Sequence, residues 1–155
     1  YNKREIKSVI RNAGIKSHIE SVRTTDNLIG SLSNVLNNSD AFLALADAQI
    51  FNRKTAKNIL LTTYRQRTPI IAYSASYVKA GALAAVYSTP KQIATQTADT
   101  LIKFITNNPA TLNKNTHPYD FEIAINKNVD KSLGIPISSE SKIKNKLLKM
   151  LGRKK

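Results

Sequence analysis

The residues of this sequence that could do chemistry follow its apolar runs. Asp47 comes shortly after the run "AFLAL", and a second run, "IIAY", is followed by further polar residues. The residues that end or follow this second run are Tyr73, Ser74, Ser76 and Tyr77. A carboxylate there can pair with a ligand ammonium, hydroxyls can donate or accept hydrogen bonds, and a tyrosine offers a flat apolar face. The alternative interpretation of Asp47 is a turn residue or helix cap.

Signatures of the common enzyme classes are absent. The sequence has no GxSxG, P-loop, HExxH or GxGxxG motif. His18 and His117 lack acidic partners at a useful spacing, and Asp120 and Glu122 alternate along an expected strand, so that we expect them to face solvent. Zero cysteines exclude disulfides, thiol catalysis and cysteine-ligated zinc. We therefore expect a binding protein rather than an enzyme, with no metal and no cofactor.

The chain is strongly basic, with a formal net charge of +14 over 155 residues. Residues 140–155 contribute seven basic side chains and one acidic side chain. Such a balance is typical of proteins with anionic partners, but zinc-finger spacing, a KH-type GxxG and an RNP-like aromatic run are all missing. We favour a solvated basic surface and expect no nucleic-acid partner. The length suits one domain, and no apolar run approaches the roughly 20 residues of a membrane span.

Helices and strands are expected to alternate along the chain. The apolar spacing predicts strands at 15–22, 41–45, 70–73, 83–87 and 121–126. It predicts helices at 3–13, 26–36, 53–67, 90–107 and 127–133, with Thr25 or Asp26 as the cap of the second. The segment "TPKQ" reads as a capping box in which Thr89 caps the helix and Gln92 reaches back. The fold class predicted is α/β, a mostly parallel sheet with helices on both faces.

The order of elements also predicts where a ligand would bind. In an open parallel sheet, ligands lie outside the carboxyl ends of the strands. Asp47, Ser74 and Ser88 each follow a different expected strand, and we expect them on one rim of the sheet. At the other end of the chain, residues 141–151 have the spacing of an amphipathic helix, with apolar side chains interleaved with lysines.

Three segments carry a resemblance to a known family. They are "LADAQIFNRKT", "LLTTYRQRTPIIAYSASYVKAGALAAVYSTPKQIATQTADTLIKF" and "FEIAINKNVDKSLGI". Together they resemble the ABC-transporter substrate-binding protein family, in the branch of the tryptophan- and tyrosine-type binding proteins. The match runs over roughly residues 1–137 and is most specific from Arg65 to Gln92. Where the family commonly has a proline after the strand "IIAY", this chain has Ala75.

The resemblance implies a Rossmann-like lobe of a type I periplasmic-binding-protein fold. Residues 1–137 would be the carboxy-terminal lobe, without its opening strand, and 138–155 a basic tail that can be helical. The chain would cross a hinge near Tyr87 to Thr89, and the segment 88–110 would pack on an amino-terminal lobe that is absent here. We therefore expect a fragment or a processed product.

The resemblance also implies a site and partners. Asp47 matches an acid that meets a ligand amino group, and the loop from Ser74 to Gly81 matches ligand-facing backbone. The ligand-binding set expected in this way is Asp47, Tyr73, Ser74, Ser76, Tyr77 and Gly81. The implied function is capture of a small, amino-acid-like ligand between two lobes for an ABC importer, with a membrane permease as partner. The implied location is periplasmic or extracytoplasmic, with a lipid anchor at the missing amino terminus as one means of attachment.

Two alternatives remain open from the sequence. One is a periplasmic ligand-sensing module of a signalling protein, which keeps the fold and changes the partner. The other is a basic protein that associates with membranes or nucleic acid, for which the charge of 140–155 is the support.

Overall fold

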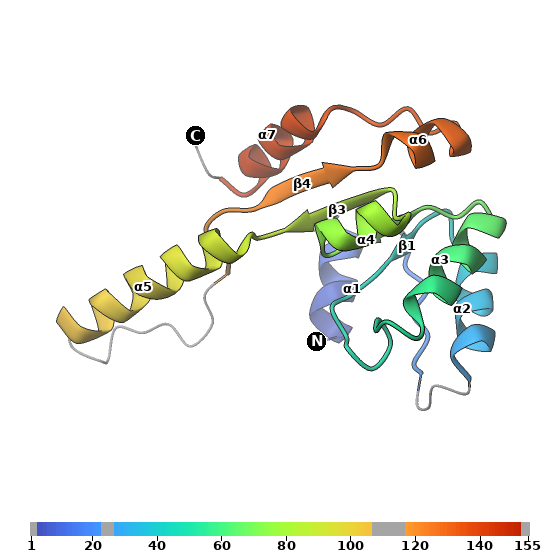
Figure 1. Ribbon diagram of the computed structural model, residues 1–155, viewed down its shortest axis with the longest axis horizontal. Coiled ribbons are helices and arrows are strands. Elements are labelled where there is room, and N and C mark those ends of the chain that lie inside the picture. Colours follow the sequence, from blue (N-terminus) through green and yellow to red (C-terminus); the bar gives the residue numbers. More distant parts are fainter. Residues whose placement is uncertain (1–2, 23–26, 107–116, 153–155) are drawn as a thin grey trace.

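The computed structural model describes residues 3–22, 27–106 and 117–152, and a four-stranded sheet lies at its centre (Figure 1). The strands are β1 (Phe42–Leu43), β2 (Ile70–Ala72), β3 (Ala84–Tyr87) and β4 (Glu122–Ile125), in that order across the sheet. β1, β2 and β3 are parallel, whereas β4 runs antiparallel to β3. The expected α/β class with a mostly parallel sheet is confirmed.

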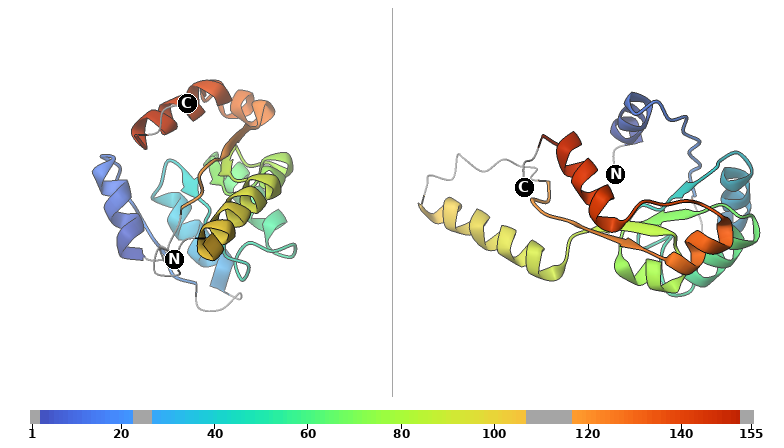
Figure 2. Two further views of the ribbon diagram at one scale, coloured as in Figure 1. Left: turned by 90° about the vertical axis from the view of Figure 1, so that its left-hand side faces the viewer. Right: turned by 90° about the horizontal axis from the view of Figure 1, so that it is seen from above.

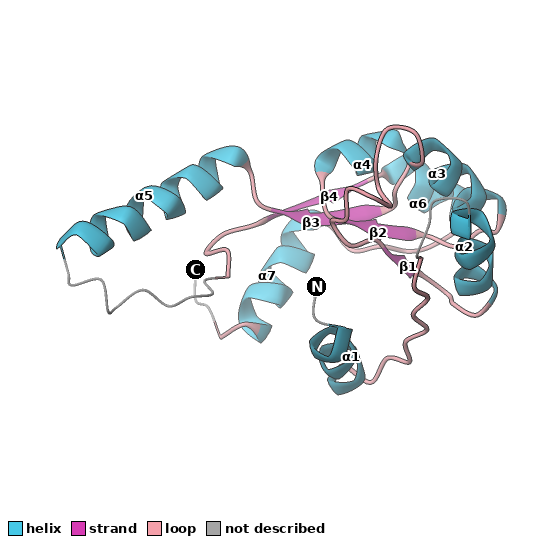
Figure 3. Ribbon diagram, turned by 90° about the horizontal axis from the view of Figure 1, so that it is seen from below, coloured by secondary structure: helices cyan, strands magenta, loops and turns pink. Residues whose placement is uncertain are grey.

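Seven helices occupy the described part of the chain. They are α1 (Lys3–Asn12), α2 (Leu28–Asn37), α3 (Ala56–Arg65), α4 (Ala75–Ala80), α5 (Pro90–Thr106), α6 (Lys127–Leu133) and α7 (Glu140–Met150). Figures 2 and 3 show α1 and α7 on one side of the sheet and α3 and α4 on the other. α7 packs against β4, and α2 packs against α3. None of these helices is long and apolar enough to cross a bilayer.

The core lies where α2, α3 and α4 cover the parallel strands. Ile59 of α3 is only 1% exposed, and Ile70 and Ala72 of β2 are buried between the helices and the neighbouring strands. Further buried members are Leu28, Leu32, Leu36, Ala44, Val78, Ala82 and Ala85. Removing this apolar surface from water is the main stabilising contribution. The carboxyl ends of β1 and β2 are thereby held by packing that does not depend on a ligand.

α5 extends away from the sheet (Figure 1). Its first turn has the predicted capping box: the Thr89 N–H donates to Gln92 Oε1 over 2.8 Å, and the Gln92 N–H donates to Thr89 Oγ1 over 3.2 Å. No residue of α5 is buried, although several of its side chains are large and apolar. The exposed apolar residues of α5 are Ile93, Leu101, Ile102, Phe104 and Ile105. A helix of this kind normally requires a partner surface to be stable.

Two expected elements are wrong. Residues 15–22 form no strand in the described structure but an extended coil, because a strand requires a hydrogen-bonded neighbour and none pairs with this segment. Residues 75–80 form α4, whereas the sequence predicted a loop there. The third expected helix begins three residues late, at Ala56, because turns occupy the residues before it. Thr25 and Asp26, the predicted caps of α2, lie outside the described residues.

Candidate functional site

The parallel strands deliver several predicted site residues to one edge of the sheet. Phe42 pairs with Ile70 and Leu43 with Ile71, so β1 and β2 end on the same side. Asp47 follows β1, and Tyr73 and Ser74 follow β2, which places them at what we call the carboxyl edge. Ser88 follows β3, which is parallel to β2, and lies at the same side. The strand-end rule applied to the sequence therefore predicted this grouping correctly.

Asp47 organises a turn at the carboxyl edge. Its Oδ1 accepts the backbone N–H of Gln49 over 2.9 Å and that of Ile50 over 3.4 Å, and its carbonyl oxygen accepts the Phe51 N–H over 2.7 Å. This is the turn role that the sequence left open. No described residue forms a hydrogen bond with Oδ2, and the side chain is half-buried. Asp47 therefore holds the turn with one oxygen and leaves the other available.

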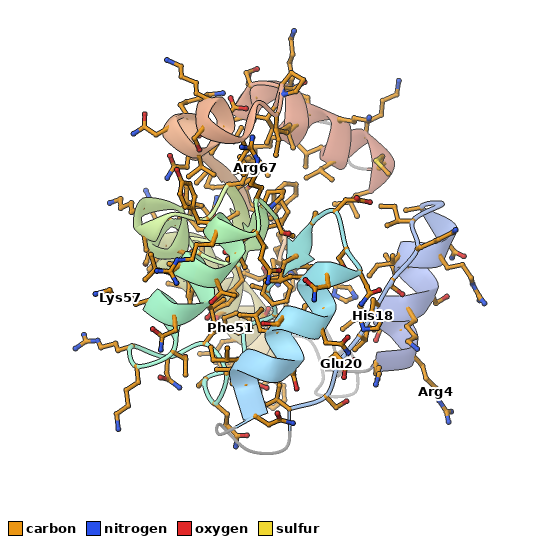
Figure 4. All side chains as sticks on the ribbon, turned by 90° about the vertical axis from the view of Figure 1, so that its right-hand side faces the viewer. Arg4, His18, Glu20, Phe51, Lys57 and Arg67 are labelled. Carbon is orange, nitrogen blue, oxygen red and sulfur yellow. The ribbon has the colours of Figure 1, made fainter. Side chains whose placement is uncertain are left out.

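The turn made by Asp47 places Phe51 in an aromatic cluster that the sequence analysis missed. The ring of Phe51 lies edge-on to Tyr73 and to Tyr77, with centroids 6.0 Å apart in both pairs. Tyr73 and Tyr77 lie 5.2 Å apart, and Phe42 of β1 lies 6.2 Å from Phe51. Edge-to-face pairs of this kind are favourable beyond the area that they bury. Figure 4 shows Phe51 directed toward the body of the molecule, whereas Lys57 extends outward.

Tyr77 is held as a neutral hydroxyl. Burial raises the pKa of its phenol above the ordinary value, and the hydrogen bond and charge of the neighbouring Tyr73 raise it further. The hydroxyl therefore stays protonated through the physiological range. It can act as a hydrogen-bond donor or acceptor at the carboxyl edge, in addition to the apolar face of its ring.

The remaining predicted site residues differ in their surroundings. Ser74 is the N-cap of α4, and its Oγ accepts the Tyr77 N–H over 3.4 Å, whereas Ser76 is exposed on the helix. Gly81 lies away from the others, beyond the far end of α4. There the Val78 carbonyl accepts the side-chain amide of Asn126 over 2.8 Å, and Asn126 follows β4 at the amino end of β3. The fold therefore does not bring Gly81 to the carboxyl edge.

Gly81 has a conformational role instead. Its φ of +128° lies in a region that residues with a Cβ rarely adopt, and it ends α4 so that the chain can turn into β3. We infer that glycine is required here by the backbone.

Charged side chains have partners in the structure that the sequence did not predict. His18 was expected to lack an acidic partner, yet its Nε2 lies 3.1 Å from Glu20 Oε1, in the coil between α1 and α2 (Figure 4). Asp120 and Glu122 were expected to face solvent, and their side chains are indeed 54% and 38% exposed, but both also contact Lys144 of α7, with closest N–O distances of 3.3 and 3.2 Å. Glu122 and Lys144 are 22 residues apart in the chain, so a short-range sequence pattern could not predict this ion pair.

Two hollows lie elsewhere on the described surface. One, of about 480 Å³, is lined by residues of α5 together with Pro118, and the other, of about 560 Å³, lies beside α1. Neither includes a residue of the carboxyl edge. Among the described residues, no group of three or more histidine, aspartate or glutamate side chains is arranged to hold a metal ion. The carboxyl edge offers one carboxylate and an aromatic surface, an arrangement suited to binding.

Comparison with known proteins gives one family and several solved structures. The family model described as ABC transporter substrate binding protein matches residues 2–146. A conserved domain protein from Vibrio cholerae is similar over 91% of this chain, with 22% identity and a TM-score of 0.68. The ABC domain in complex with L-Trp from Streptococcus pneumoniae is also similar over 91%, with 20% identity and a TM-score of 0.69.

A third solved structure shows the same fold. It is the ligand-free, open structure of a substrate-binding protein with adhesive properties from Clostridium difficile, which is 18% identical over 88% of this chain with a TM-score of 0.65. The chain spans about half of each of these structures, 47%, 47% and 45% of their lengths. No curated protein sequence matches the chain.

Proposed function

The chain belongs to the ABC transporter substrate-binding protein family, and from this premise we propose that it is one lobe of a two-lobe protein that captures a small, amino-acid-like ligand for an ABC importer. In this proposal the protein binds its ligand and does no chemistry on it. Closure of two lobes traps the ligand, and the closed protein presents it to a membrane permease. The site of action is extracytoplasmic.

The observation that carries the ligand class is the pairing of a carboxylate with aromatic rings at the carboxyl edge. Asp47 Oδ2 is available for a ligand ammonium, while Oδ1 is fixed by two backbone N–H groups, so the carboxylate is already oriented. The neighbouring rings of Phe51, Tyr73 and Tyr77 supply an apolar surface. A cation and an apolar side chain on one small molecule would satisfy both features.

The observation that supports a second lobe is the exposed apolar surface of α5. Ile102 is 59% exposed and Ile105 is 73% exposed, on a helix that extends away from the sheet. We assign residues 1–137 to the carboxy-terminal lobe and propose that the segment 88–110, of which the structure describes residues up to Thr106, crosses to the other lobe and packs on it. The matched structures are about twice as long as this chain, which leaves room for a lobe of similar size.

The test is calorimetric titration of a panel of amino acids into two proteins: the 155-residue chain and a two-lobe protein that contains it. In the single lobe an Asp47–ammonium pair is exposed to water and contributes only about 0–1 kcal/mol. We expect no tight binding by the single lobe and clear binding of at least one amino acid by the two-lobe protein.

The titration has two informative failures. Tight binding by the 155-residue chain would show that the site is complete in one lobe. Absence of binding to every amino acid by a folded two-lobe protein would exclude the proposed ligand class. A second panel of sugars and dipeptides would then identify another class of solute.

A further inference from the structure

Four side chains from three parts of the chain meet where the chain passes between β3 and α5 and where it returns to β4. We call residues 88–89 and 117–121 the crossing segments. Asp120 lies on the second of them, Glu122 begins β4, Gln92 lies in the first turn of α5, and Lys144 lies in the middle of α7.

The contacts among these side chains join both crossing segments to α7. Lys144 Nζ lies 3.3 Å from Asp120 Oδ1 and 3.2 Å from both carboxylate oxygens of Glu122. Gln92 Nε2 donates to Asp120 Oδ2 over 2.9 Å and to Glu122 Oε1 over 2.8 Å. The Ser88 hydroxyl donates to the Asp120 carbonyl over 2.8 Å. A single lysine thus offsets part of the charge of the two carboxylates that contact Gln92 at the start of α5.

α7 is fixed at two further points. Glu140 Oε1, at its amino end, accepts the backbone N–H of Ile125 in β4 over 3.0 Å. Lys144 Nζ also lies 5.9 Å from the centre of the Phe121 ring, and Phe121 is buried. Lys144 itself is 27% exposed, so part of its charge is withdrawn from water beside its partners. α7 therefore packs along the edge strand β4 and contacts the second crossing segment through Lys144.

We propose that Lys144 is a positioning residue that sets the direction in which α5 leaves the sheet. This inference rests on the proposed two-lobe arrangement, in which that direction determines how the lobes approach each other. Exposed ion pairs contribute little to global stability. Loss of the lysine charge therefore changes the orientation of α5 more than it changes folding.

The experiment measures the orientation of α5 directly in the 155-residue chain. Because the chain has no cysteine, spin labels can be attached at two introduced positions without other changes. Suitable sites are Lys57→Cys on α3 and Lys103→Cys on α5, since both lysines are exposed. The distance distribution between the labels is then recorded by pulsed electron resonance in the parent pair and in variants.

We expect a narrow distribution in the parent pair and a broadened, shifted one in Lys144→Met. Lys144→Arg, which keeps the positive charge, should restore the narrow distribution. Lys146→Met is the matched control, because Lys146 is exposed on the same helix and forms no hydrogen bond or ion pair within the described structure. Asp120→Asn provides a second test at the other end of the contact, and should also broaden the distribution.

An unchanged distribution in both folded Lys144→Met and folded Asp120→Asn would overturn the proposal. Equal broadening in Lys146→Met would also overturn it, since the effect would then follow from any loss of charge on α7. Circular dichroism of each variant establishes that it is folded. The experiment involves no ligand, so its failure is distinct from a failure of the proposed transport function.

Discussion

The ring of Phe51 stands edge-on to the ring of Tyr77, with centroids 6.0 Å apart and planes at 82°. Phe51 reaches this position because Asp47, four residues earlier, holds the intervening turn through Gln49 and Ile50. One carboxylate therefore has two separable tasks. Its Oδ1 holds the turn at the carboxyl edge, and in the proposed function its Oδ2 binds the ligand.

Substitutions at Asp47 separate these two tasks. Asp47→Asn keeps an oxygen acceptor for the turn and should leave the free energy of unfolding nearly unchanged, whereas Asp47→Ala should lower it by about 1 kcal/mol. In the two-lobe protein, both variants remove the charge partner of a buried ammonium and should weaken binding by about 2–5 kcal/mol. Urea unfolding and calorimetric titration give the two quantities. If Asp47→Asn binds the ligand normally, Asp47 is a turn residue alone.

Phe51 should stabilise the fold as well as the carboxyl edge. Phe51→Ala removes the ring that touches Phe42, Tyr73 and Tyr77, and because Phe51 is half-buried we expect a loss of about 2–3 kcal/mol, below that of a fully buried phenylalanine. Tyr64→Ala is the control, since Tyr64 is exposed on α3 and should change stability by less than about 1 kcal/mol. Chemical denaturation measures the free energy of unfolding of both variants. Equal losses would show that the aromatic cluster does not stabilise the fold.

Gly81 should matter for stability and not for ligand affinity. Gly81→Ala imposes a Cβ at φ +128° and should cost about 1–2 kcal/mol from backbone strain. Space is adequate, since the nearest atom to the added Cβ, Leu60 Cδ2, lies 3.9 Å away. Ser76→Ala, on the exposed side of α4, serves as the control and should be nearly neutral. Reduced affinity in a fully folded Gly81→Ala two-lobe protein would place Gly81 in the site after all.

The ion pair between Lys144 and Asp120 should be lost at very low pH and at very high pH. Burial acts to raise the pKa of Asp120, but the Phe121 N–H together with Lys144 and Gln92 outweighs it and holds that pKa below the ordinary value. For Lys144, burial acts to lower the pKa, but Glu122 and Asp120 outweigh it and raise that pKa. Stability from Asp120 is therefore present above the ordinary aspartate pKa of about 3.9 and lost as pH falls through the lower folded value.

The sign is opposite for Lys144. Its contribution is present below the ordinary lysine pKa of about 10.4 and lost as pH rises through the higher folded value. Because Asp120 is 54% exposed, both contributions should shrink with added salt. NMR titration of the Asp120 carboxyl is the measurement, and its pKa should move up in Lys144→Met but not in Lys146→Met. An identical titration in all three proteins would show that Lys144 does not act on Asp120.

The basic tail should not direct the protein to membranes through an apolar helix face. Ile143, Leu147 and Leu148 are half-buried on α7, which packs against β4, whereas Met150 and Leu151 are exposed. Replacing both exposed residues with serine keeps the charge, and we expect unchanged co-sedimentation with vesicles of anionic and of neutral lipid. Loss of binding in this variant would support the membrane alternative.

Features that depend on neighbouring residues in the chain could be predicted from the sequence by itself. The capping box at Thr89, the end of α6 at Gly134 and the alternation of helices and strands depend on neighbours within a few residues. The alternation predicted a mostly parallel sheet, and a parallel sheet brings Asp47 and Ser74 to the same edge whatever the side chains between them. The resemblance to the substrate-binding family could be recognised for the same reason, since it was carried by contiguous segments.

Tertiary structure decided the rest, because those contacts join residues that are distant in the chain or lack a sequence pattern. Residues 15–22 were predicted as a strand from their sequence, but no strand of the described structure pairs with them, so they form coil. Phe51 reaches the carboxyl edge only because a turn places it against Tyr73, and Lys144 contacts Glu122 only because α7 packs against β4. Gly81 was assigned to the site together with the loop from Ser74. That segment is the helix α4, whose first residues lie at the carboxyl edge and whose last residues lie near the amino end of β3, so Gly81 is separated from the other predicted site residues.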